Sequence, residues 1–274
     1  MSEISELIKS RKSVRSFDGN PLRPEDRERL EQYMGTIVNP FGVAVRFVLL
    51  DAKEHGLSSP VLTGETLYAA GVVEKGPDAD VAFGFSFEKL VLYAWSLGIG
   101  TTWIGGTMKR ELFEKAAGLR SHEMMPCVTP LGYPAKKRSV KGTLMRKGAG
   151  ADSRMSSEKL FFDGAWGVPL LPSGQDGLDE LTEMVRWAPS AVNRQPWRII
   201  RKDGVFHFYE KKDKGYVSDR TGDLQRVDLG IALCHFMSGM ESLGKTPVLT
   251  VSDPGVTVPD GVFYIASVRE GASA

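Results

Sequence analysis

Two arginines lie four positions apart near the start of the chain, with a serine between them. They are Arg11, Ser13 and Arg15, in the stretch RKSVR. A planar guanidinium donates two parallel hydrogen bonds to a phosphate, and a hydroxyl adds a further donor. Each charge-assisted bond contributes about 1.5–3 kcal/mol, so three would supply much of the roughly 8 kcal/mol of a micromolar complex. The spacing therefore indicates a phosphate site, although basic residues at a helix end also occur as a solvated surface that complements the helix dipole.

A second polar cluster occurs much later, in APSAVNRQPW at residues 188–197. Pro189 is expected to end a helix, because the residue before a proline is pushed out of the α region. Ser190 and Asn193 then offer a hydroxyl and an amide, and an amide both donates and accepts hydrogen bonds. These groups suit a planar ligand, with Gln195 bracing the loop. The alternative is an ordinary turn built by serine and asparagine between a helix and a strand.

A glycine-rich stretch, GIGTTWIGG at residues 98–106, lies between these clusters. It is not a dinucleotide fingerprint, because Trp103 occupies the sixth position of the GxGxxG pattern. Gly105 and Gly106, which follow Ile104, lack a Cβ atom and allow the backbone to approach a ligand closely. A helix C-cap followed by a core strand is the alternative interpretation.

Composition and motifs exclude several other functions. The formal net charge of +1 gives no strong electrostatic reason to bind nucleic acid or an anionic membrane. The sequence has no HExxH, Walker loop, GxSxG or metal-spaced Cys/His cluster, so no metal site is predicted. Cys234 and His235 are adjacent on a predicted helix and therefore point to different faces. Cys127 and Cys234 form no disulfide framework, and no signal peptide is visible, so a cytoplasmic protein is expected.

Helices and strands that must position these clusters can be read from the periodicity. Apolar residues at helical spacing predict helices over residues 3–10, 24–35, 79–97, 108–118, 178–188 and 222–244. Apolar and β-branched runs predict a buried strand at 43–50, strands at 101–104 and 124–134, a hairpin over 197–210, and two closing strands, PVLTV and VFYIASV. A stretch rich in glycine, serine, proline and lysine separates two such sets and is interpreted as a crossover or a linker.

An internal repeat links the two sets of elements. VAFGFSFEKLVLYAWSLG at 81–98 and VDLGIALCHFMSGMESLG at 227–244 both have 18 residues, begin Val-x-x-Gly and end Ser-Leu-Gly. Each predicted long helix is followed by a strand and preceded by a helix, a loop and a strand. This agreement indicates an internal duplication, with a first half at residues 1–145, a crossover at 146–177 and a second half at 178–274.

Together with LGYPAKKRS at 131–139, these motifs resemble the FMN-dependent nitroreductases, and the duplication is similar to the tandem, TM1586-like branch of that family. The resemblance implies an α+β fold, a mostly antiparallel sheet packed by helices and duplicated into a pseudo-dimer. In the two-fold dimers of the family, one subunit gives the phosphate-binding box and the other gives the APSxxNxQPW-type loop. A fused chain that keeps the box in one half and the loop in the other would retain one composite site.

The resemblance also assigns roles to individual residues. Basic residues after the Gly-Tyr-Pro turn are expected to return to the phosphate, with Lys136 as an alternative candidate. Backbone N–H groups of the glycine-rich stretch are expected near N5 or O4 of the flavin, and Arg15 near N1 and O2, where a positive group stabilises the reduced ring. The residues expected to bind the cofactor are Arg11, Ser13, Arg15, Ile104, Gly105, Gly106, Lys137, Arg138, Pro189, Ser190 and Asn193.

By the same resemblance, the chain is expected to be an FMN-dependent oxidoreductase. It would take hydride from NAD(P)H and pass it by ping-pong exchange to a small acceptor, such as a nitro compound or a quinone, and no dedicated catalytic acid is evident. A non-catalytic protein that binds FMN or another small ligand is the alternative, and a relic that keeps only the pseudo-dimer interface is a third. The partner is expected to be a small molecule, and the chain a monomeric pseudo-dimer or a weak homodimer.

Overall fold

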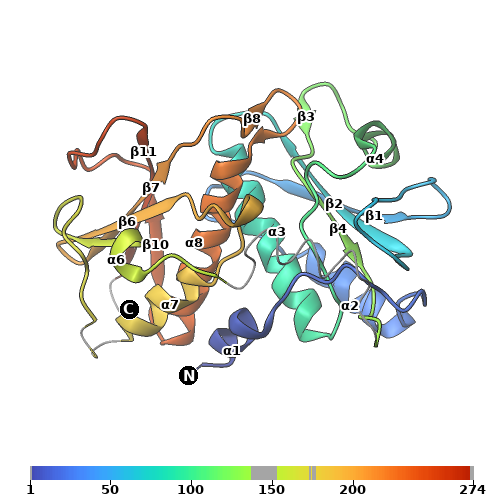
Figure 1. The fold of residues 1–274 in the computed structure, drawn as a ribbon, viewed down its shortest axis with the longest axis horizontal. Helices are drawn as coiled ribbons and strands as arrows, with labels where there is room; N and C mark the ends of the chain where they lie inside the picture. The colour runs from blue at the N-terminus through green and yellow to red at the C-terminus, as the bar shows by residue number, and fades with distance from the viewer. Residues whose placement is uncertain (1, 137–152, 173, 175–176, 272–274) are drawn as a thin grey trace.

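A computed structural model describes residues 2–136, 153–172, 174 and 177–271. Two long central helices lie between two β-sheets, with shorter helices below and beside them (Figure 1). In the first half the elements are α1 (Glu3–Ser10), α2 (Pro24–Met34), β1 (Val45–Asp51), β2 (Leu67–Glu74), α3 (Ala79–Ser96), α4 (Arg110–Ala116), β3 (Glu123–Met124) and β4 (Val128–Leu131). The later elements are α6 (Ser157–Leu160), β5 (Phe161–Asp163), α7 (Leu178–Arg186), η1 (Ala191–Asn193), β6 (Trp197–Lys202), β7 (Val205–Lys211), β8 (Val217–Ser218), β9 (Gly222–Asp223), α8 (Leu224–Ser242), β10 (Pro247–Thr250) and β11 (Val262–Glu270).

The two central helices, α3 and α8, pack so closely that glycines are required between them. A Cβ atom on Gly84 would lie 2.0 Å from the carbonyl oxygen of Val227, and one on Gly230 would lie 2.1 Å from that of Val81. Val81 and Gly84 occupy the same places in the first repeat as Val227 and Gly230 do in the second. The contact is therefore reciprocal, as it is across the two-fold axis of a dimer. This reciprocity agrees with the predicted duplication into a pseudo-dimer.

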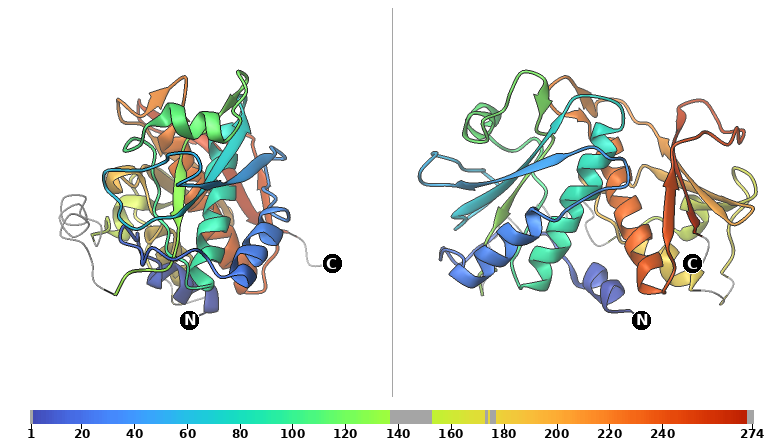
Figure 2. Two further views of the ribbon diagram at one scale, coloured as in Figure 1. Left: turned by 90° about the vertical axis from the view of Figure 1, so that its right-hand side faces the viewer. Right: turned by 180° about the vertical axis from the view of Figure 1, so that it is seen from behind.

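Each central helix also covers one sheet, as the view from behind shows (Figure 2). The first sheet has the order β1-β2-β3, with β4 also paired to β2, and all its pairs are antiparallel. The second has the order β10-β11-β7-β6-β5, in which only the β5–β6 pair is parallel. Phe83 and Phe87 of α3 pack in one cluster with Val73 of β2, and Phe236 of α8 packs with Phe208 of β7. The predicted α+β class, with mostly antiparallel sheets packed by helices, is confirmed.

Three predictions about strands need correction. The strand at 43–50 was predicted to be buried, but β1 is a half-buried edge strand because only β2 pairs with it. The buried centre of that sheet is β2, which was not predicted because its Ala-Ala-Gly run has little strand propensity. A Cβ atom on Gly71 would lie 2.7 Å from the ring of Phe83, so close packing of α3 explains the glycine. Residues 101–104 form isolated bridges rather than a strand.

The halves exchange contacts beyond the central helices. α1 belongs to the first half in sequence, yet Ile8 lies in the same core cluster as Leu181 and Met184 of α7. The Ser2 backbone N–H and hydroxyl both donate to Glu180, which ties the start of α1 to the second half. The residues that follow α1 therefore begin at the boundary between the halves.

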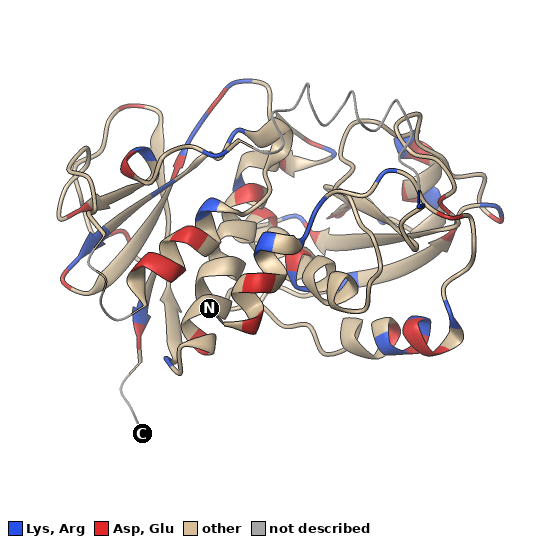
Figure 3. Cartoon of the chain, turned by 60° about the horizontal axis from the view of Figure 1, so that its bottom comes forward, with Lys and Arg blue, Asp and Glu red and all other residues tan. Residues whose placement is uncertain are grey.

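Positive and negative side chains are mixed over the residues that the structure describes. Figure 3 shows Lys and Arg positions interspersed with Asp and Glu positions over both halves, in keeping with the formal net charge of +1. Within the part of the chain that the structure describes, no helix combines the length and the apolar character needed to cross a membrane.

Candidate functional site

The RKSVR box is extended in the structure, because α1 ends at Ser10 and Arg11 has φ −61° and ψ 131°. Ser13 pairs with Thr101 in a parallel bridge, and the Val14 backbone N–H donates to the Thr101 carbonyl at 2.8 Å. Further along, Phe17 pairs with Pro134. The box thus runs beside the glycine-rich stretch and then beside the strand-turn segment, so three of the four motifs lie side by side.

Two glycines allow this docking. A Cβ atom on Gly100 would lie 2.8 Å from the side chain of Val14, and one on Gly132 would lie 2.9 Å from the ring of Phe17. Gly100 and Gly132 also pair with each other, with the Gly100 N–H donating at 2.8 Å. The apolar residues of the box therefore pack onto bare backbone, which fixes the position of the residues between them.

The three predicted phosphate ligands differ from their neighbour in exposure. The side chain of Arg11 is 9% exposed, and Ser13 and Arg15 are half-buried, whereas Lys12 is exposed. An extended chain carries alternate side chains on the same side, so residues 11, 13 and 15 can share a face that residue 12 does not. Lys137 and Arg138, the other predicted phosphate ligands, lie outside the described residues.

The end of the glycine-rich stretch is held by backbone pairing and by an arginine. The Ile104 N–H and carbonyl are both hydrogen-bonded to Val128 at 2.9 Å, and its side chain lies in the core. Arg110 donates to the carbonyl oxygens of Gly105 and Met125, and burial lowers its pKa. A Cβ atom on Gly106 would meet nothing within 4 Å. Ile104 therefore has no spare backbone group, whereas the backbone at Gly106 is open.

The loop at 188–197 is held by its own polar side chains. The Ser190 hydroxyl accepts from the Gln195 N–H at 2.9 Å. The Gln195 side chain accepts from the Met155 N–H at 2.9 Å and donates to the carbonyl of Asn193, which agrees with the predicted bracing role. The Asn193 amide donates to the carbonyl of Ser153 at 3.0 Å. Ser190, Asn193 and Gln195 therefore fix the loop, and Pro189 precedes them, three residues after α7 ends at Arg186.

The backbone at the tip of this loop is strained. Val192, Asn193 and Gln195 have φ of 44°, 59° and 50°. The left-handed region is unfavourable for a β-branched residue, and Val192 is also 66% exposed. Strain of this kind persists only where the surroundings impose it, and it occurs often at functional sites.

A buried carboxylate joins the loop to the central helices, and the sequence analysis did not identify it. The Ala191 N–H donates to both side-chain oxygens of Asp228 on α8, at 3.0 and 3.1 Å. Asp228 is 3% exposed, and burial raises its pKa well above the usual range, although the bond from Ala191 opposes this. The signal that could have found it is an acidic residue two positions before the repeat glycine, in an otherwise apolar stretch of a predicted helix.

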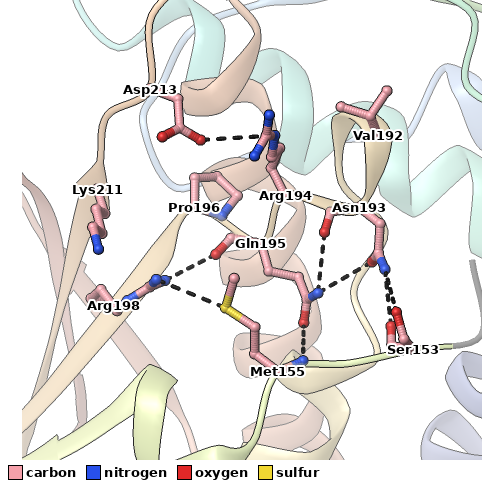
Figure 4. Close-up of a pocket in the computed structure, with 10 residues that line it drawn as sticks. All are labelled: Ser153, Met155, Val192, Asn193, Arg194, Gln195, Pro196, Arg198, Lys211 and Asp213. Carbon is pink, nitrogen blue, oxygen red and sulfur yellow. Dashed lines mark hydrogen bonds and ion pairs between the residues drawn. The ribbon is translucent and has the colours of Figure 1, made fainter. Parts of the chain in front are cut away.

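A pocket of about 550 Å³ lies against the outer side of the loop (Figure 4). Only Asn193 among its lining residues was predicted to belong to a site. Figure 4 shows Arg198, Lys211 and the Arg194–Asp213 ion pair around it, with Met155 next to Arg198 and Ser153 next to Asn193. The lining residues are Ser153, Met155, Val192, Asn193, Arg194, Gln195, Pro196, Arg198, Lys211 and Asp213.

The two parts of the predicted composite site are thus each fixed to one central helix. The box pairs with Thr101, just after α3, and the loop is bonded to Asp228 of α8. A buried bridge also crosses between the helices, because the Glu88 carboxylate accepts from Trp103 at 3.2 Å and lies 3.0 Å from Nε2 of His235. The arrangement can hold an anion at one end and a planar group against backbone at the other.

Comparisons with known proteins identify the family and the fold of the chain. Residues 3–240 match the model of a family described as "Putative TM nitroreductase". The structure of a nitroreductase-like protein from Thermotoga maritima is 22% identical, with a TM-score of 0.61, and covers 98% of this chain and 93% of its own. At this identity, the likeness is one of fold.

Two shorter proteins match about half of the chain. A nitroreductase family protein from Clostridium novyi NT is 17% identical over 49% of this chain and 86% of its own, with a TM-score of 0.42. A protein from Clostridium difficile R20291, described as an FMN-dependent nitroreductase, is 16% identical over 48% of this chain and 88% of its own, with a TM-score of 0.41. No curated protein sequence matches the chain.

Proposed function

We propose that the chain binds FMN and uses NAD(P)H as the electron donor. The premise is that the chain belongs to the TM nitroreductase family and is therefore an oxidoreductase. The acceptor would be a small molecule such as a nitro compound or a quinone. We place one flavin site in each chain, built from residues 1–145 and 178–274 together. A single chain then suffices for the site, whether or not it associates weakly with a second copy.

The observation that carries the proposal is the docking of the RKSVR box onto bare glycine backbone. Arg11, Ser13 and Arg15 alternate along an extended stretch that is paired with Thr101, so their side chains can converge on one dianion. Arg11 is 9% exposed, and a guanidinium held in such a place favours an anionic ligand. We assign the three residues to the FMN phosphate, and we propose Lys137 and Arg138 as additional ligands.

The residues present also fit the ring end of FMN. We propose that the backbone of Gly105 and Gly106, which is open at Gly106, faces N5 and O4, because the Ile104 N–H is already used by Val128. Pro189, Ser190 and Asn193 would approach the pyrimidine edge from the other half. Hydrogen bonds to Asp228 and Met155 hold the loop in place through other parts of the protein, which supports a fixed loop for such a contact.

When bound, FMN would supply the redox chemistry by accepting a hydride from NAD(P)H and passing it to the acceptor. The protein would orient the ring and exclude alternative poses. Arg15 is the candidate for the positive group beside N1 and O2, where it would favour the reduced form. None of the four motifs contains a carboxylate or a histidine, so we expect the substrate or water to supply the proton.

Paired variants of the box test the proposal. The protein is soaked with FMN, desalted and examined by its visible spectrum, and NADH or NADPH is then added without oxygen. Wild type should retain a flavin band that one of the nucleotides bleaches. Replacing both arginines, R11Q/R15Q, removes two charge-assisted bonds and should weaken FMN binding by about a hundredfold or more.

The matched control is Lys12→Gln, which removes a charge from the same stretch but from its exposed side. This variant should retain flavin like wild type. Equal retention by R11Q/R15Q and wild type would refute the phosphate assignment. A flavin that is retained but that neither nucleotide bleaches would refute the donor and indicate a protein that binds FMN without this reaction.

A further inference from the structure

The pocket beside the loop contains a buried guanidinium. Arg198 is 7% exposed and donates through Nη1 to the carbonyl oxygens of Gln195 and Trp197, at 2.9 and 2.6 Å. Its second terminal nitrogen lies 3.8 Å from the sulfur of Met155, which is a weak acceptor. Within the described part of the chain it forms no ion pair, and Asp213 acts on it only at longer range. Burial accordingly lowers its pKa.

A buried charge of this kind is unusual. Arginine is almost never fully buried unless it is paired, because removing the charge from water is costly. The two carbonyl oxygens compensate for part of the cost, but they carry no net charge. An anion that enters the pocket would supply the missing partner.

The pairing of β6 with β7 brings a second cation to the same place. Arg198 lies opposite Tyr209, and Lys211 is two residues further along, so Arg198 and Lys211 point to the same face of the sheet. Both line the pocket, and Figure 4 draws them on one side of it.

Arg194 completes the group from the loop itself. It is paired with Asp213 at 4.0 Å, but both side chains are about half exposed, so this pair is weak. The lining therefore carries three cations, Arg194, Arg198 and Lys211, against one carboxylate, Asp213. Their charges sum to +2, in a molecule whose formal net charge is +1.

We propose that this pocket binds the phosphate group of a small molecule. Its volume of about 550 Å³ is large enough for a phosphate with part of the molecule that carries it. Asn193 belongs both to the pocket and to the loop assigned to the flavin, so a molecule anchored here by its phosphate lies beside the redox site. The assignment to a redox substrate rests on the proposed function, whereas the binding of phosphate does not.

Titration of the FMN-saturated protein with inorganic pyrophosphate in a calorimeter tests the pocket while FMN occupies the proposed phosphate box. Wild type should bind pyrophosphate, and added salt should weaken binding because two of the three cations are exposed. The variant R194Q/K211Q removes both exposed cations without touching the core and should bind about tenfold more weakly or worse. Lys202→Gln, which removes an exposed cation from the turn end of the same hairpin, should bind like wild type.

Two further measurements distinguish a role of Arg198 in binding from a role in folding. Arg198→Gln should lose the rise in melting temperature that pyrophosphate gives to wild type, while its far-UV circular dichroism stays that of a folded protein. If this variant does not fold, R194Q/K211Q still decides the question. Absence of binding to wild type, or equal binding by wild type and R194Q/K211Q, would overturn the proposal.

Nucleotide fragments then identify the source of the phosphate. Tighter binding of ADP or adenosine 2′,5′-bisphosphate than of pyrophosphate would support a pyridine nucleotide. Equal or weaker binding would support a phosphorylated acceptor instead. The flavin band of the same sample is measured independently, so loss of flavin with intact pyrophosphate binding would count against the proposed function and not against this pocket.

Discussion

Adding a single methyl group at the α3–α8 contact should destabilise the whole chain. In Gly84→Ala the new Cβ atom would lie 2.0 Å from the Val227 carbonyl oxygen, where ordinary contacts begin at 3.4 Å. The obstacle is backbone rather than a flexible side chain, so the two helices must separate. Overpacking a core costs about 1–3 kcal/mol, and a backbone clash of this size belongs at the upper end.

An opposing effect reduces the loss. Alanine is more favourable than glycine inside a helix by about 1 kcal/mol. The net loss is therefore about 2 kcal/mol in the free energy of unfolding. For a chain of this size, each kcal/mol lowers the melting temperature by about 2–4 °C, so a decrease of about 4–8 °C is expected.

Thermal unfolding followed by circular dichroism measures this change, with urea unfolding as the second assay. Gly230→Ala should give a similar loss, because its Cβ atom would lie 2.1 Å from the Val81 carbonyl. The double variant should lose less than the sum, since one separation of the helices relieves both clashes. Gly76→Ala, where nothing lies within 4 Å, is the matched control and should remain within about 0.5 kcal/mol of wild type. If Gly84→Ala and Gly230→Ala were as stable as Gly76→Ala, the reciprocal contact would not exist as described.

Two further predictions concern titration and strain. Burial raises the pKa of Asp80 to about 6, so the folded state keeps this proton to a higher pH than the unfolded state does, and the stabilisation present below about pH 4 should be lost as pH rises through 6. Asp80→Asn should remove that part of the pH dependence. The urea midpoint is measured between pH 4 and 8, and an equal change of the midpoint with pH in wild type and Asp80→Asn would contradict the prediction. Val192 has φ of 44°, which asparagine tolerates better, so Val192→Asn should stabilise the chain by about 1 kcal/mol without changing flavin retention. An unchanged or lower melting temperature would show that the tip is not strained.

The long helices and the hairpin could be predicted because their patterns are local. α3 and α8 each carry many apolar residues and end at a glycine with positive φ, Gly98 and Gly244. The hairpin has an Asp-Gly turn between two apolar runs. The duplication could be found from the matched ends of the two helices. Only the structure explains why both repeats begin with Val-x-x-Gly, because these residues form the contact between α3 and α8.

The features that the sequence analysis missed depend on tertiary contacts. The glycine in β2 is explained only by the ring of Phe83, which comes from a helix that packs on the sheet. The box was predicted to follow a helix, but its extended course depends on pairing with Thr101, a residue distant in sequence. Asp228, Arg110 and Arg198 were not identified, because each acts on the backbone of a segment distant in sequence or on a pocket that exists only after folding.

The number of flavins per chain tests the central claim most directly. Protein saturated with FMN and desalted is measured for flavin by its visible absorbance and for protein by amino-acid analysis, with the mass of the complex determined in the same solution. One FMN per chain, lost in R11Q/R15Q and kept in Lys12→Gln, is the result that a single composite site predicts. Two per chain would mean that the second half has its own phosphate site, and none would mean that the pseudo-dimer has kept the fold without the cofactor.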